Sequence, residues 1–363
     1  MARRQLNAIS LFSGAGGDSV GMRDANINVI AFSEIDKIAR NTHEQNFPQC
    51  VLLGREFNGD IVKTTNDELD TYKDKIDVLF AGFPCQGYSN AGKKKTNDPR
   101  NTLFNEFLRV TKRTNPPIII GENVKGLLTK KTSDDEKYID VIIREFEKLG
   151  YIINYKIMKT DRYCVPQKRE RLIIIGVLPG YLINDKIIFP PELNLDVNLR
   201  DIITFDMIGA IKINKNIFDF NLIPDECILT DYENDEYEND PHPYLISKVN
   251  CDNKTYNDKT YTTLFSFSKR GSPIHCEIID IRNPCKTIIC TYNNQPRLFV
   301  PLRNKNGFYL RCILPIELQQ IQGFKPDFTF NGNTKNKIIQ IGNAVPPPLI
   351  ACVCKKLIEC MIR

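Results

Sequence analysis

Short apolar runs that alternate with amphipathic helices over residues 7–180 constrain the fold of this chain most strongly. The runs have the length and β-branched content of buried strands, and they lie at residues 8–12, 29–32, 78–81, 118–121 and 172–177. Residues 138–149 carry apolar side chains at helical spacing, so this segment is a predicted core helix. Strands that alternate with helices build a doubly wound sheet with helices on both faces. The sequence therefore predicts an α/β fold.

The composition and apolar periodicity of the sequence change near residue 185. Beyond it the apolar periodicity weakens, Pro190 and Pro191 interrupt the chain, and residues 231–240 are acidic and polar, as in an exposed loop. The last stretch contains a helix candidate at 349–361, whose apolar spacing fits packing back onto the first domain. We expect a first domain of residues 1–185 that residues 336–363 complete, and a second, smaller and irregular domain of residues 186–335. Short strands are expected in the second domain at residues 261–267 and 286–291.

Length and composition indicate a soluble protein. The chain has 363 residues, of which 42% are hydrophobic, and no run approaches the ~20 apolar residues of a membrane span. It begins without an apolar signal segment, so we expect a cytoplasmic protein that is not secreted and does not bind a membrane. The 12 cysteines are scattered and the three histidines lie far from any cysteine pair, so we expect reduced cysteines and no metal site.

The net charge of +5 is a small excess of 49 basic over 44 acidic residues and does not by itself indicate nucleic-acid binding. Local basic clusters at residues 93–95, 168–171 and 269–270 are more informative. For each isolated cluster, a solvated face is the alternative interpretation.

A glycine-rich turn follows the first predicted strand. Residues 11–17 read LFSGAGG and precede a helix, and Glu34 and Asp36 come just past the second strand. Glycines let the backbone approach a ligand closely, and a carboxylate about 20 residues on can hold ribose hydroxyls. This pattern indicates a nucleoside cofactor, although a tight structural turn is the alternative. The full G-x-G-x-x-G of a dinucleotide site is absent.

Cys85 is the candidate nucleophile. It follows Pro84 in residues 82–89, at the carboxyl end of a predicted strand, where open sheets place their sites. The basic loop that follows favours the thiolate, which is the attacking form. A buried structural cysteine is the alternative.

Two further motifs supply charged groups. Glu122 follows the strand at 118–121, so it is expected at the same sheet edge as Cys85, where a carboxylic acid could donate a proton to a ring nitrogen. Residues 167–171 concentrate three cations, including Arg169 and Arg171, which suit phosphate or base contacts. A helix cap and a solvated charge run are the respective alternatives.

These four motifs, closed by residues 340–347 (QIGNAVPP), resemble in their order the C5-cytosine DNA methyltransferase family. The resemblance extends to residues 98–104, 282–287 and 322–324 and leaves a stretch of about 185–280 unmatched, which in the family is the target-recognition region. The chain departs from the family pattern at Tyr88, Asn101 and Cys164, and residues 311–318 match the family segment loosely.

The resemblance implies a Rossmann-like, S-adenosylmethionine-dependent methyltransferase sheet with a smaller target-recognition domain. Cys85 would add to C6 of a flipped-out cytosine, Glu122 would bind the amino group and protonate N3, and the methyl group would pass to C5 within a specific DNA sequence. Arg169 and Arg171 would hold the base in the catalytic site. The product would be S-adenosylhomocysteine, and no metal is required. The implied cofactor residues are Phe12, Gly14, Gly16, Gly17, Glu34, Asp60, Pro84, Leu103 and Asn343.

Double-stranded DNA is the expected partner of a monomer, together with a companion restriction endonuclease that acts on the same sequence. The predicted DNA-binding residues are Gln86, Ser89, Lys93, Lys269 and Arg270. Residues 266–273 are predicted to enter the major groove, where Arg can read guanine. A tRNA cytosine-5 methyltransferase is the alternative, although the Cys-Phe-Thr signature of that branch is absent. A silent DNA-binding relative and a nucleotide-binding oxidoreductase are weaker alternatives.

Overall fold

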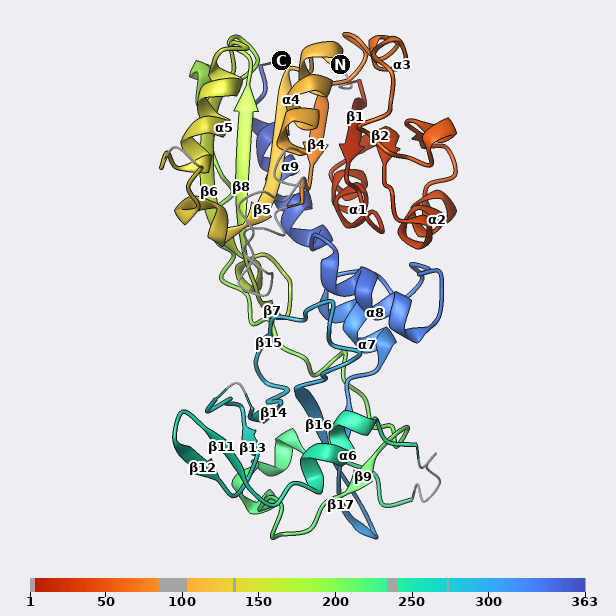
Figure 1. Ribbon diagram of the computed structural model, residues 1–363, viewed down its shortest axis with the longest axis vertical. Helices are drawn as coiled ribbons and strands as arrows, with labels where there is room; N and C mark the ends of the chain where they lie inside the picture. Colours follow the sequence, from red (N-terminus) through yellow and green to blue (C-terminus); the bar gives the residue numbers. More distant parts are fainter. Residues whose placement is uncertain (1–3, 85–102, 133–134, 234–239, 273, 363) are drawn as a thin grey trace.

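The computed structural model describes residues 4–84, 103–132, 135–233, 240–272 and 274–362. The first half of the described chain forms a seven-stranded mixed sheet of order β3-β2-β1-β4-β5-β8-β6 (Figure 1). Its strands are β1 (Leu6–Leu11), β2 (Ile27–Ser33), β3 (Val51–Leu52), β4 (Val78–Ala81), β5 (Ile118–Val124), β6 (Ile152–Lys159) and β8 (Glu170–Val177). The strands from β3 to β5 are parallel, whereas β8 is antiparallel to both neighbours. The predicted α/β class and its strands are confirmed.

Helices cover both faces of this sheet. Successive residues of β4 point to opposite faces, so Val78 and Phe80 join one core cluster and Leu79 and Ala81 join another. The first cluster includes residues of α1 (Gly17–Asp24) and α9 (Pro347–Cys360). The second includes residues of α3 (Asn66–Asp70), α4 (Leu103–Thr114) and α5 (Tyr138–Glu147). Burial on both faces explains why these strands read as unbroken apolar runs.

Helix α9 packs against the first sheet, because its apolar side chains share a core cluster with β1, β2, β4, β5 and β8. Residues Thr334–Cys360 are the one stretch of the described chain long and apolar enough to cross a membrane, but 67% of the tested window is buried. The stretch is divided into α8 (Thr334–Asn343) and α9, which begins at the proline run. Such burial is typical of a core helix in a soluble protein.

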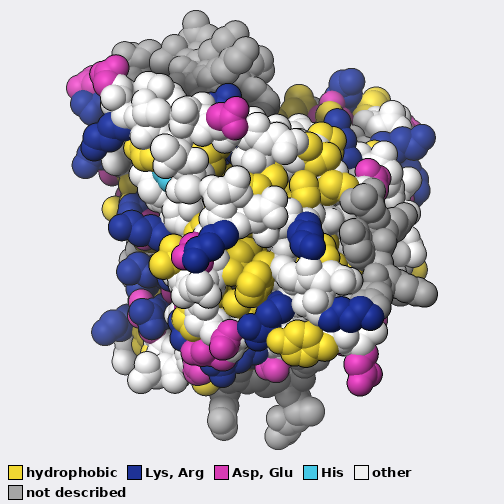
Figure 2. All heavy atoms as spheres, turned by 90° about the horizontal axis from the view of Figure 1, so that it is seen from below, with side chains coloured by type: hydrophobic (Ala, Val, Ile, Leu, Met, Phe, Trp, Pro, Cys, Tyr) yellow, Lys and Arg dark blue, Asp and Glu magenta, His cyan; other side chains and the backbone are white. Residues whose placement is uncertain are grey.

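A second sheet lies below the first in Figure 1 and has the order β13-β14-β16-β17-β9, with β10 beside β16. Its strands are β9 (Ile211–Lys212), β10 (Leu229–Thr230), β13 (Phe265–Phe267), β14 (Cys276–Ile278), β16 (Leu298–Asn304) and β17 (Gly307–Cys312). A hairpin of β11 (Lys254–Tyr256) and β12 (Lys259–Tyr261) and the helix α6 (Pro243–Val249) belong to the same region. Seen from below, Lys and Arg side chains gather along the left edge, on the side of β11 and β12 in Figure 1 (Figure 2).

Two predicted strands of this region are shorter than expected. The segment 261–267 is a strand only at its two ends, in β12 and β13. The segment 286–291 contributes only the end of β15 (Cys285–Lys286), which pairs with β7 (Gln167–Lys168). Beyond it, Thr287 Oγ1 donates to the Lys168 carbonyl and the Ile288 amide donates to Gln167 Oε1. Side-chain contacts therefore replace the strand ladder there.

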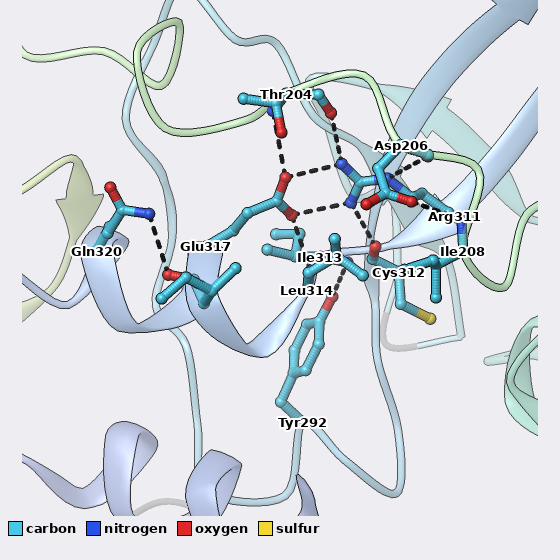
Figure 3. A network of polar contacts seen from close by, with 11 residues as sticks. Thr204, Asp206, Ile208, Tyr292, Arg311, Cys312, Ile313, Leu314, Glu317 and Gln320 are labelled. Atoms are coloured by element: carbon cyan, nitrogen blue, oxygen red, sulfur yellow. Dashed lines mark hydrogen bonds and ion pairs between the residues drawn. The ribbon is translucent and has the colours of Figure 1, made fainter. Parts of the chain in front are cut away.

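A buried ion pair ties the second sheet to α7 (Pro315–Ile321), as Figure 3 shows. The guanidinium of Arg311 on β17 contacts both carboxylate oxygens of Glu317, at 2.7 and 2.9 Å. The Arg311 side chain is 0% exposed and that of Glu317 2%. Arg311 also donates to the carbonyls of Thr204, Asp206 and Cys312, so every nitrogen of the guanidinium has a partner.

Candidate active site

The glycine-rich turn between β1 and α1 requires unusual backbone angles. Phe12, Gly14 and Gly16 have positive φ values of 56°, 56° and 91°. A Cβ on Gly16 would lie 2.9 Å from ring atoms of His43 and Phe47, so this position excludes larger residues. A Cβ on Gly14 would meet no atom of the described residues within 4 Å, so these residues leave the loop open at that point. The loop therefore presents bare backbone to the space beside it.

Glu34 lies directly against this loop. Its carboxylate accepts hydrogen bonds from the Gly14 amide at 2.8 Å and from the Asp36 amide at 2.7 Å. Burial raises the pKa of Glu34. Asp36 instead caps α2 (Lys37–Asn46), because its side chain accepts from the amides of Ile38 and Ala39. The two acidic residues thus have different tasks, and Glu34 is the one at the loop.

Two further predicted cofactor residues approach the same region. A Cβ on Gly59 would lie 2.3 Å from the Glu34 carbonyl oxygen, which brings the neighbouring Asp60 to the Glu34 segment. A Cβ on Gly17 would lie 2.2 Å from the Val345 carbonyl oxygen, so α1 touches the turn between α8 and α9. Asn343 ends α8 two residues earlier and is exposed. The structure thus brings residues far apart in the sequence to one loop.

Glu122 lies within β5, which extends past the predicted strand to Val124, and it comes one residue after the last pair between β4 and β5. Arg171 on β8 holds it through a 2.8 Å contact between Arg171 Nε and Glu122 Oε1. The two side chains are 13% and 11% exposed, so the pair is mostly withdrawn from water. Glu122 Oε2 lies 3.8 Å from where a Cβ on Gly82 would stand, and Gly82 precedes Cys85 by three residues. This second oxygen faces the segment that leads to the candidate nucleophile.

The backbone before Cys85 is fixed by a residue that sequence reasoning did not single out. Asn123 is buried, and its side-chain amide donates to the Phe83 carbonyl at 3.1 Å. Asn123 follows Glu122 on the same strand, so one strand end carries both the acid and the contact to the nucleophile segment. In the sequence, the only signal for this contact was a polar side chain, Asn123, directly after Glu122.

The candidate nucleophile Cys85 and the predicted DNA contacts Gln86, Ser89 and Lys93 lie outside the described residues. Pro84 and Leu103 flank that segment, and both are partly buried. Lys269 is exposed and Arg270 partly exposed in the loop after β13, a strand of the second sheet.

Arg169 is placed differently from Arg171. It is 4% exposed, and its guanidinium donates to the carbonyls of Ile288 and Gly342 at 3.1 Å and of Ala344 at 3.4 Å. Burial, and secondarily the nearby Arg171 charge, lower the pKa of Arg169. Gln167 and Gln322 extend this contact, since Gln167 Nε2 donates to Gln322 Oε1 at 2.6 Å. Arg169 therefore joins β7, the chain after β15 and the α8–α9 turn.

A buried polar cluster lies beneath the glycine-rich loop and was not predicted. The Asp18 carboxylate accepts from the hydroxyls of Ser10 and Ser13, and Ser19 Oγ lies 3.0 Å from His43 Nε2. Burial raises the pKa of Asp18 to about 6 and lowers the pKa of His43 to about 3. His43 stacks on Phe32 at 3.7 Å between ring centroids.

Among the described residues, no three His, Cys, Asp or Glu side chains are grouped so that they could hold a metal ion. The eleven described cysteines are all free.

Comparison with known proteins points to one family. The family described as C-5 cytosine-specific DNA methylase matches residues 6–359. The type II methyltransferase M.BsuFI of Bacillus subtilis is 31% identical over 354 residues, which are 96% of this chain and 71% of that protein. The type II methyltransferase M.DsaV of Dactylococcopsis salina is 28% identical, over 99% of this chain and 88% of that protein.

Solved structures share the fold. The Entamoeba histolytica methyltransferase EhMeth superposes with a TM-score of 0.63 at 18% identity, over 98% of this chain and 99% of that one. A DNMT2 mutant of Spodoptera frugiperda gives a TM-score of 0.64 at 16% identity, over 98% and 100% of the two chains.

Proposed function

The chain belongs to the C-5 cytosine-specific DNA methylase family, and we propose that Cys85 and Glu122 are the groups that carry out its methyl transfer. The activity is DNA cytosine-5 methylation. The observation that carries the residue assignment is the Glu122 carboxylate: one oxygen is bound to Arg171, and the other faces the segment that leads to Cys85. A carboxylic acid so placed can serve a base that Cys85 attacks.

The family implies S-adenosylmethionine as the methyl donor, and the residues around the glycine-rich loop fit a nucleoside. The space that the described residues leave over Gly14 admits a ligand close to the backbone, and the Glu34 carboxylate lies beside it. We assign the ribose to Glu34 and the remaining contacts to Phe12, Gly14, Gly16, Gly17, Asp60, Pro84, Leu103 and Asn343. When bound, the cofactor supplies an electrophilic methyl group.

The chain's own residues activate the cytosine. C5 of cytosine is a poor nucleophile, but addition of the Cys85 thiolate to C6 creates an enamine whose C5 can attack. Glu122 donates a proton to N3 and accepts a hydrogen bond from the exocyclic amino group, which neutralises charge on the ring during the attack. The C5 proton then passes to solvent water and the N3 proton returns to the Glu122 carboxylate, which re-forms the C5–C6 double bond and expels the Cys85 thiolate.

Three side chains position these groups. Arg171 holds the Glu122 carboxylate through Oε1 and leaves Oε2 for the base. Asn123 fixes the Phe83 carbonyl, two residues before Cys85. Arg169 acts indirectly, because its guanidinium is occupied by three backbone carbonyls and anchors the α8–α9 turn that carries Asn343.

We assign catalysis and cofactor binding to residues 1–185 with 336–363, and DNA recognition to residues 186–335. The target base leaves the duplex to reach the site, at a cost of a few kcal/mol that contacts to the protein offset. Gln86, Ser89, Lys93, Lys269 and Arg270 are the proposed DNA contacts. Since the relatives named above are type II methyltransferases, we further propose a companion restriction endonuclease that acts on the same sequence.

The test is transfer of labelled methyl groups from S-adenosylmethionine to mixed-sequence DNA, read at base resolution. We expect C5 methylation within one sequence word by the wild-type chain and none by Cys85→Ala. The same assay with tRNA resolves the alternative acceptor: transfer to tRNA without transfer to DNA would refute the proposal.

A further inference from the structure

One buried carboxylate lies beneath the glycine-rich loop and has no part in the mechanism above. Asp18, in the first turn of α1, is 1% exposed. Its oxygens accept from the hydroxyl of Ser10 on β1 and, at 3.3 Å, from the hydroxyl of Ser13. Ser13 lies between Phe12 and Gly14, two loop residues with positive φ that are assigned to the cofactor. The Asp18 carboxylate is therefore one side-chain contact away from the backbone of the loop.

The groups around Asp18 within the described ranges do not supply a positive charge. Ser19 Oγ lies 3.5 Å from Asp18 Oδ2 and 3.0 Å from His43 Nε2. Burial lowers the pKa of His43 to about 3, so this ring is neutral at physiological pH. Burial, and secondarily the Asp18 charge, raise the pKa values of the Cys50 and Cys354 thiols to about 12, so both thiols are neutral as well. An ionised Asp18 therefore leaves a net negative charge in a buried position.

This charge does not stabilise the fold. Burial raises the pKa of Asp18 to about 6, so ionisation of the carboxylate in the folded chain costs free energy at neutral pH. The hydroxyls of Ser10 and Ser13 and the N-terminus of α1 reduce this cost without removing it. An asparagine of the same shape would carry no such cost. The carboxylate is therefore better explained by a ligand that its charge attracts than by folding.

The donor and the product of methyl transfer differ in charge at one atom. S-adenosylmethionine carries a positive sulfonium, whereas S-adenosylhomocysteine has a neutral thioether at the same place, and the ribose, base and amino-acid groups of the two molecules are identical. Hydrogen bonds from the loop to those shared groups therefore serve both molecules alike. A negative charge that water does not screen acts over a longer distance than a hydrogen bond, and it distinguishes the two molecules through the sulfonium.

We propose that Asp18 is a specificity-determining residue of the cofactor site, whose buried charge makes the site prefer the sulfonium of S-adenosylmethionine over the thioether of S-adenosylhomocysteine. The proposal deepens the function proposed above and rests on its assignment of the cofactor to the glycine-rich loop. Once the methyl group has left, the product lacks the charge that Asp18 attracts, which favours its release. For a separation of about 10 Å and an effective dielectric constant of about 20 to 40, Coulomb's law gives a preference of about 4- to 16-fold.

The experiment is a calorimetric measurement of the dissociation constants of both molecules, at pH 7.5, with the wild-type chain, Asp18→Asn and the control Asp24→Asn. Asp24 is exposed at the other end of α1. We expect Asp18→Asn to lower the ratio of the two dissociation constants, product over donor, by about 4- to 16-fold, and Asp24→Asn to leave it unchanged. If Asp18→Asn leaves this ratio unchanged, even while weakening both ligands equally as a purely structural residue would, the proposal is overturned.

The same ratio should depend on pH. In the wild-type chain it should fall as the pH drops from 7.5 through about 6, because Asp18 becomes protonated, and Asp18→Asn should lack this part of the decrease. Burial also raises the pKa of Glu34, and the amino groups of the ligands titrate, but these contributions are common to both proteins and cancel in the comparison. Identical pH profiles of the ratio in the two proteins would contradict the proposal.

If Asp18→Asn does not fold, Ser10→Ala keeps the carboxylate and removes one of its donors. Loss of this donor raises the pKa of Asp18, so we expect the midpoint of the pH profile to move upward by about one pH unit. A midpoint that does not move would overturn the proposal. A wild-type chain that binds neither S-adenosylmethionine nor S-adenosylhomocysteine would instead refute the assignment of the cofactor site.

Discussion

Two arginine–glutamate pairs in this protein use the same chemistry for different ends. The Arg311–Glu317 pair is fully buried, and Glu317 accepts from the amides of Thr204 and Leu314 in addition to the guanidinium (Figure 3). The Glu122–Arg171 pair retains partial exposure, and its contact within the described part of the chain runs from Arg171 Nε to Glu122 Oε1 at 2.8 Å. The saturated pair has a structural explanation in its own contacts, whereas in the proposed mechanism the second oxygen of Glu122 serves the substrate. The comparison therefore turns on whether Glu122 acts in catalysis while Glu317 acts in stability.

The largest expected effect that separates the two pairs is on catalysis. Glu122→Gln keeps a side-chain oxygen for Arg171 but cannot donate a carboxyl proton. We expect methyl transfer to fall by about 10²- to 10⁴-fold, the usual contribution of a general acid, while the melting temperature changes little. Rates under saturating DNA and cofactor, measured beside thermal unfolding, check this. Near wild-type turnover by the Glu122→Gln variant would show that Glu122 is not the general acid. The matched control is Glu145→Gln on the surface of α5.

For the Arg311–Glu317 pair, we expect the main effect of a substitution to be on the free energy of unfolding. Glu317→Ala leaves the Arg311 guanidinium buried without its carboxylate, so we expect a loss of about 3–5 kcal/mol in the free energy of unfolding. Urea denaturation measures it. The control is Glu359→Ala, which breaks the exposed Lys356–Glu359 pair and should cost about 1 kcal/mol or less. If the Glu317 variant were as stable as this control, the structural role of the Arg311–Glu317 pair would be contradicted.

A smaller effect concerns a buried carboxylate, that of Asp18, which has no cationic partner within the described ranges of the chain. Asp18 is held by serine hydroxyls, and burial raises its pKa from 3.8 to about 6. A raised folded-state pKa means that the protonated form stabilises the fold at low pH, and this stability is lost as pH rises from 3.8 through 6. Since one pKa unit corresponds to about 1.4 kcal/mol, the loss reaches about 3 kcal/mol at neutral pH.

Asp18→Asn cannot ionise, so its stability relative to the wild type should rise between pH 4 and pH 7.5. The lowered pKa of His43 acts in the opposite direction but is common to both proteins. Unfolding free energies of the two proteins at both pH values give the difference. A difference that does not depend on pH would show that Asp18 titrates normally in the folded state.

The sequence predicted most of the first sheet because its strands are buried on both faces. The apolar runs of β4, β5 and β8 are long enough to be read directly. By contrast, β6 was not predicted: it is an edge strand, and most of its side chains are exposed or partly exposed, so its composition carries a weak signal. At residues 286–291, the Thr287 hydroxyl donates to the Lys168 carbonyl and the Ile288 amide donates to Gln167 Oε1, and these two hydrogen bonds stand in place of an expected strand ladder.

In the candidate site, too, some residues could be placed from local sequence and others only from tertiary contacts. Glu34 directly follows β2, and Glu122 lies in β5 just beyond its pairing with β4, so the placement of both could be predicted from local sequence. The roles of Asn123 and Arg169 could not, because each depends on contacts with a chain segment far away in the sequence. The difference between Arg169 and Arg171, two residues apart, became visible only with the tertiary partners of each guanidinium.

The most direct test of the central claim uses duplex DNA that carries 5-fluorocytosine at the target position. Because fluorine replaces the C5 proton that must leave, the adduct between Cys85 and C6 should persist after methyl transfer. We predict a covalent protein–DNA product whose mass-mapped peptide contains Cys85, formed by the wild-type chain and absent with Cys85→Ala. A folded wild-type chain that methylates ordinary DNA but forms no such adduct, or an adduct at another residue, would contradict this account.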